Sequence, residues 1–262
     1  MSEDLVGHVD RRLREVLGEH VLRARPPARA EAAAALTEAH ATAYGFAPEY
    51  VVFAESPLAG AHAVGLVQLF HNDASGLARA PVDARTADRA PAGVADDVRR
   101  QVDAQRSHGR RALPLDRAVA PEAALWGSLF ARVEEHLGLS AAHQAYGATY
   151  HPRYSAWDNA VVEQLDEHLP ADWFYHRDLN SVNSLCDALF LQAMSESGVP
   201  GLEAWGPFIA ATRFVDHYWM RSGYIVISDP PAMVELEVEA GVRGAAAVTV
   251  RWPDGWTVTV RE

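Results

Sequence analysis

Three short stretches of the sequence hold residue types that could perform chemistry. The densest is YHRD, in which His176 could transfer a proton, Asp178 could orient that histidine and Arg177 could anchor a carboxylate. The stretch lies where a helix is expected to begin, so Asp178 could equally cap that helix. The two roles are compatible, because helix N-termini are also positions at which pKa values shift.

The other two stretches supply a second catalytic residue and the walls of a site. In VDHYW, His217 is a further candidate for proton transfer, and Tyr218 and Trp219 are candidates for substrate binding. Aromatic residues in such a segment are equally expected in a hydrophobic core. Glu55 and Ser56 follow the apolar run YVVFA, and Ser56 is expected to cap the next helix, whose positive end favours anion binding.

Metal and cofactor chemistry lack their usual motifs. The twelve histidines include no HExxH or HxH spacing, so we predict no metal site. All 23 basic residues are arginine, which excludes a Schiff-base lysine and a phosphate-binding P-loop lysine. The chain also lacks GxGxxG and GxSxG, and we therefore predict no cofactor.

The charge and the cysteine content restrict partners and location. A net charge of -12 opposes binding to nucleic acids and to anionic lipids, and no apolar run is long enough to cross a membrane. Cys186 is the only cysteine, which excludes an intramolecular disulfide and a Cys-rich zinc site. Because the N-terminus is acidic and amphipathic rather than a signal peptide, we expect a cytoplasmic protein.

The hydrophobic patterns predict the elements that must position these residues. A strand at 50–53 leads into a helix that ends near 70, which makes one βα unit. Further helices are expected at 3–22, 28–44, 93–106, 121–138, 179–194 and 202–222, and a loop at 72–92. Four runs with period-two alternation, 224–228, 233–239, 246–252 and 256–262, predict a C-terminal β meander with a hairpin turn at Pro253-Asp254-Gly255.

These elements predict an α+β protein that is mainly helical, with a small C-terminal antiparallel meander packed on the helices. We expect residues 1–262 to form one domain, with a helical body over 1–222 and the meander over 223–262. Alternation along the meander predicts one face against the helices and one face in water. The segment 202–222 is the helix nearest to it in sequence.

Two stretches resemble a family of uncharacterised bacterial domains. They are YVVFAESPLAGA at 50–61 and GYIVISDPPAMVELE at 223–237, the latter followed by VRWPDGWTV at 250–258. Members of this family, found in actinobacterial and cyanobacterial proteins and sometimes beside leucine-rich repeats, share the strand ending in Ser-Pro-Leu and the Pro-Asp-Gly-Trp turn. Their tail usually carries histidines, whereas residues 234–250 here contain none. The resemblance implies an architecture but no activity.

Two functional hypotheses follow. The first is an enzyme-like tailoring protein that acts on a small molecule or peptide by general acid–base chemistry, with His176, Asp178 and His217 as catalytic residues. Its substrate-binding residues would be Arg177, Tyr218, Trp219, Glu55 and Ser56. The second is a non-catalytic binding or scaffold module, in which the meander pairs with a partner or with a second copy in a homodimer.

Overall fold

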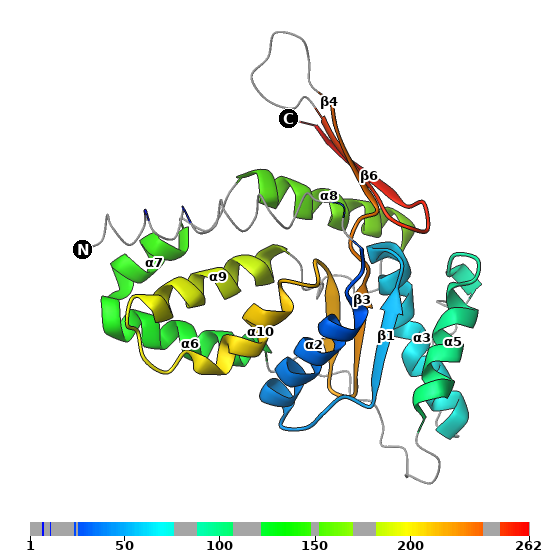
Figure 1. The fold of residues 1–262 in the computed structure, drawn as a ribbon, viewed down its shortest axis with the longest axis horizontal. Coiled ribbons are helices and arrows are strands. Elements are labelled where there is room, and N and C mark those ends of the chain that lie inside the picture. Colours follow the sequence, from blue (N-terminus) through cyan, green and yellow to red (C-terminus); the bar gives the residue numbers. More distant parts are fainter. Residues whose placement is uncertain are drawn as a thin grey trace.

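The computed structural model describes residues 7, 11, 24, 26–75, 88–106, 122–147, 152–169, 182–237 and 247–261. In these ranges the helices are α2 (Arg29–Tyr44), α3 (Pro57–Ser75), α5 (Val94–Gln105), α6 (Glu122–Leu137), α7 (Leu139–Gly147), α8 (Pro152–His168), α9 (Val182–Glu196), the 3-10 helix η2 (Glu203–Trp205) and α10 (Gly206–Ala211). The strands are β1 (Tyr50–Ala54), β2 (Tyr218–Arg221), β3 (Tyr224–Ser228), β4 (Met233–Glu237), β5 (Ala247–Arg251) and β6 (Thr257–Arg261). They form sheet A, in the order β1-β3-β2, and sheet B, in the order β4-β5-β6 (Figure 1).

Sheet A is buried on both faces. Strand β1 runs parallel to β3, with Tyr50 opposite Tyr224, and β2 pairs antiparallel with β3. Alternate side chains enter two separate hydrophobic clusters, because successive residues of a strand point to opposite faces. One cluster joins the sheet to α3 and α5, and the other joins it to α2, α9 and α10. The sheet is therefore the middle layer between two groups of helices (Figure 1).

Two sequence predictions near this sheet are wrong. The segment 202–222 is not one helix but contains η2, α10 and strand β2. The run 224–228 does not begin the meander; it forms β3, the central strand of sheet A. Each residue of Tyr224–Ile227 is at most 2% exposed. A strand that is apolar on both faces needs helices on both sides, and a meander with one wet face cannot provide them.

Sheet B is the C-terminal antiparallel meander, built from three strands. Val234, Val250 and Val258 lie opposite one another and face the core, whereas Thr249 and Thr259 pair on the other face. The predicted alternation of a packed and a wet face is thus present. The sheet packs mainly on α8 (Figure 1), and Trp252, directly after β5, also contacts His217 of the 202–222 segment.

Most of the other predicted helices lie near their predicted bounds, whereas α7 and α8 were not predicted as separate helices, and the helix predicted at 3–22 lies outside the described residues except for residues 7 and 11. Helix α2 ends at Gly45, whose φ of 79° is the left-handed conformation that glycine adopts easily. Helix α3 is longer than predicted and includes residues 72–75 of the expected loop, while 76–87 lie outside the described residues. The predicted class, α+β and mainly helical with a C-terminal meander, is confirmed. Among the described helices, none is long and apolar enough to cross a membrane.

Candidate functional site

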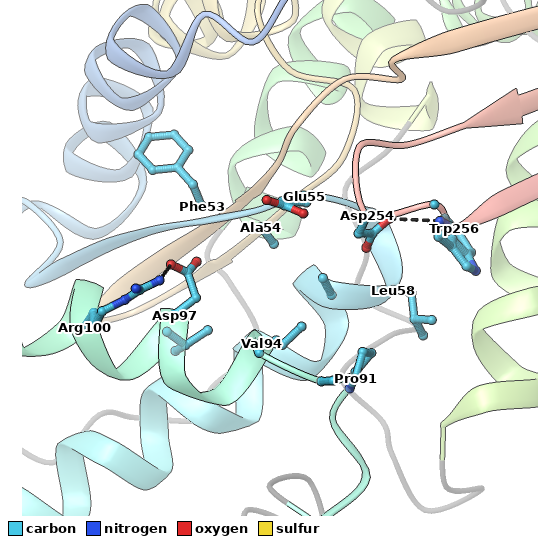
Figure 2. A pocket seen from close by; sticks show the side chains of 15 residues that line it. Phe53, Ala54, Glu55, Leu58, Pro91, Val94, Asp97, Arg100, Asp254 and Trp256 are labelled. Carbon is cyan, nitrogen blue, oxygen red and sulfur yellow. Dashed lines mark hydrogen bonds and ion pairs between the residues drawn. The ribbon is translucent and has the colours of Figure 1, made fainter.

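A pocket of about 660 Å³ opens at the carboxyl end of β1. Its walls come from three segments that are far apart in sequence: the turn from β1 into α3, the start of α5, and the turn between β5 and β6. Figure 2 shows Glu55 and Asp254 on one side of the hollow, with Asp97 and Arg100 projecting from α5 on the other. The volume lies within the range of small-molecule sites, about 300–1,000 Å³.

Asp254 is held in place by the turn that carries it. Gly255 has a φ of 88° and donates its backbone N–H to the carbonyl of Trp252, closing the turn between β5 and β6. One carboxylate oxygen of Asp254 accepts the backbone N–H of Trp256 at 3.0 Å, and the other accepts the Ser56 hydroxyl at 2.5 Å. The carboxylate is therefore fixed at the rim before any ligand arrives.

Ser56, which is buried, links the start of α3 to the turn between β5 and β6. Its Oγ accepts the backbone N–H of Ala59 and so caps helix α3, as the sequence predicts. The same hydroxyl donates its proton to Asp254, and the residue is 0% exposed. Ser56 thus positions Asp254 rather than meeting a ligand directly. Glu55, the preceding residue, is exposed and lines the pocket.

The basic groups near the pocket are already paired with carboxylates. Arg100 donates to Asp97 at 2.7 Å. Arg29 binds both oxygens of Asp229, at 2.9 and 2.5 Å, and its guanidinium lies over the Phe53 ring. The hydrogen bond that Arg29 donates to Asp229, together with the charges of Asp229, Asp97 and Glu55, raises the pKa of Arg29 against the opposing effect of burial.

The pocket is consequently acidic with apolar walls. Within the described residues, neither Glu55 nor Asp254 forms an ion pair at contact distance with a basic side chain. The apolar part of the lining includes Phe53, Leu58, Val94, Val98 and Trp256. Such a site can hold a cation against two carboxylates and an aromatic ring. No three His, Cys, Asp or Glu side chains of the described ranges are grouped so that they could hold a metal ion.

The predicted site residues are dispersed in the structure. His176, Arg177 and Asp178 lie outside the described residues. His217 lies immediately before β2, is 1% exposed and does not line the pocket. Neither of its ring nitrogens has a hydrogen-bond partner in the described part of the chain, and burial lowers its pKa to about 3.

Tyr218 and Trp219 are neighbours on β2 and therefore point to opposite faces of sheet A. Tyr218 belongs to the cluster beneath α2 and α10, whereas Trp219 packs beneath α3. They do not share a wall. Of the residues predicted to bind substrate, Glu55 lines the pocket and Ser56 lies directly behind its rim.

Sequence reasoning missed Asp254, Asp97 and Trp256. The Pro-Asp-Gly-Trp run predicts a hairpin turn correctly, and it says nothing of what that turn meets in space. Asp97 belongs to a charged helix face of the kind that is usually solvated. A local signal exists only for Asp254, because an acidic residue between proline and glycine is exposed at a turn tip.

Comparisons with known proteins add no assignment. No family model, no curated protein and no solved structure matches this chain.

Proposed function

We propose that this protein binds a small molecule or peptide that carries a positive charge, and that it does so in the pocket between β1, α5 and the β5–β6 turn. The observation that carries the proposal is the convergence of Glu55, Asp97 and Asp254 around one hollow, where the only lining guanidinium, within the described residues, is already paired with Asp97. Glu55 and Asp254 form no ion pair among the described residues, and unpaired carboxylates that face a partly apolar cavity favour a cationic ligand.

The rigidity of the rim supports binding. Asp254 is fixed by two hydrogen bonds, so a ligand does not have to order it. Trp256 adds an aromatic surface on which an ammonium or guanidinium group can rest. General acid–base chemistry on the bound molecule stays a prediction, because His176 and Asp178 lie outside the described residues and His217 is buried away from the pocket. Association through sheet B likewise stays a prediction.

Calorimetric titration with L-argininamide, a cationic probe without a carboxylate, tests the proposal. We expect Glu55→Gln to weaken binding about 10-fold or more, because a hydrogen bond to a charged group contributes about 1.5–3 kcal/mol. Glu135→Gln, an exposed carboxylate on α6 at the far side of the molecule, is the matched control and leaves the affinity unchanged (Figure 1). Equal affinities of the wild type for argininamide and for the anion succinate would rule the proposal out.

A further inference from the structure

The free edge of β1 is covered by glutamine side chains rather than by a strand. In sheet A, β1 is an edge strand, and its outward backbone groups belong to Val51 and Phe53. The amide of Gln105 accepts from the Val51 N–H at 2.9 Å and donates to the Val51 carbonyl at 2.8 Å. The amide of Gln101 does the same for Phe53, at 2.8 and 2.9 Å. We call these two amides the glutamine ladder.

The glutamine ladder can form because the repeat of the helix nearly matches the repeat of the strand. Residues four apart on a helix are separated by about 6 Å along its axis. Residues two apart on a strand are separated by about 6.6–6.8 Å and present their backbone groups on the same side. Helix α5 can therefore place one side-chain amide against every second residue of β1. Each amide supplies the donor and the acceptor that a neighbouring strand would supply.

We call each pairing of a helix residue with a strand residue in this ladder a rung. The position of the next rung, the third, holds no side-chain amide of the described residues and lies in the pocket. Two residues beyond Phe53, just past the end of β1, is Glu55, and four residues before Gln101 on α5 is Asp97. Both residues line the pocket. Within the described residues, the backbone N–H of Glu55 has no hydrogen-bond partner. Asp97 offers only acceptor oxygens, which are fixed by Arg100 and Gln101.

We infer that a ligand amide occupies this third rung. The carbonyl of that amide accepts the Glu55 backbone N–H, as the Gln101 amide accepts that of Phe53, and its N–H donates to the Asp97 carboxylate, as the Gln101 amide also does. This inference rests on the proposed function and narrows it. The ligand is a short basic peptide, bound with one amide on the ladder and its cationic group against Glu55 and Asp254.

A matched pair of probes separates the two claims. L-argininamide carries an ammonium, a guanidinium and an amide, whereas agmatine carries the two cationic groups without the amide. We expect argininamide to bind the wild-type protein at least 10-fold more tightly, and to slow hydrogen exchange at the Glu55 amide, while agmatine leaves that exchange rate unchanged. Equal affinities, each reduced by Glu55→Gln, would overturn the ladder inference and leave the proposed function intact. Absence of binding by either probe would overturn both.

The variant Asp97→Gln tests the same inference by changing the protein instead of the ligand. A glutamine at position 97 extends the series Gln101 and Gln105 by one repeat, so its own amide fills the rung. We expect this variant to lose the preference for argininamide over agmatine. Asp97→Asn removes the same charge with a shorter side chain and should keep that preference. Retained agmatine binding shows that both variants are folded. Loss of the preference in both variants, or in neither, would contradict the inference.

Discussion

At the scale of single residues, the buried polar side chains divide into those that are paired and those that are not. His40 is fully buried and has both ring nitrogens 2.8 Å from carbonyl oxygens, one of Phe46 and one of Arg221. His217 is equally buried and has no such partner among the described residues. Unpaired buried groups are costly, about 1–3 kcal/mol each, so His217 is a weak point of the core.

His217 should make the fold sensitive to acid. Its folded pKa of about 3 lies below the value of 6.5 for a solvated histidine, because burial disfavours the charged ring. Neutral His217 thus contributes stability that is present above pH 6.5 and is lost progressively as the pH falls toward 3. Between pH 7 and pH 4.5, we expect the free energy of unfolding to fall by about 2–3 kcal/mol less in His217→Phe than in the wild type, measured by urea unfolding. Identical losses in the two proteins would show that the ring is not sealed from water.

At the scale of elements, α3 approaches sheet A closely because Gly60 faces the Trp219 ring. A Cβ atom at position 60 would overlap the Trp219 ring, which is fully buried. Alanine in place of glycine within a helix normally stabilises by about 0.5–1 kcal/mol. At Gly60 the overlap should outweigh that gain.

We expect Gly60→Ala to destabilise the protein by about 1–3 kcal/mol, which is the usual cost of overfilling a packed core. Gly127 is the matched control, because it is exposed on α6 and a Cβ atom there would meet no other group within 4 Å among the described residues. Thermal unfolding monitored by circular dichroism should show a higher midpoint for Gly127→Ala and a midpoint lower by several degrees for Gly60→Ala. Shifts in the same direction would mean that α3 and Trp219 are not in tight contact.

The sequence predicted correctly those elements that are determined by residues close together in the chain. The strand at 50–53, the Ser56 cap and the hairpin turn at 253–255 depend on neighbouring residues, and all three are present. Strand β2 was predicted as helix because VDHYWM continues an amphipathic aromatic run. Its strand conformation depends on pairing with β3, and the place of β3 depends in turn on β1, far away in the sequence.

At the scale of the whole molecule, the pocket exists only because the fold joins distant segments. Glu55 follows β1, Asp97 lies on α5, and Asp254 lies in the turn of sheet B, which packs on α8. Sequence reasoning found Glu55 and Ser56 because a strand-to-helix turn is recognisable locally. It could not find Asp254 or Asp97, since nothing in their own segments indicates that they meet Glu55.

The most direct measurement is a map of backbone amide chemical shifts in the ¹⁵N-labelled protein during titration with L-argininamide. If the pocket is the binding site, the largest changes fall on Glu55, Gly93, Val94 and Gly255, from three separate segments of the lining. Changes concentrated on Thr249 and Thr259, on the exposed face of sheet B, would contradict the account and favour a module that binds through its meander.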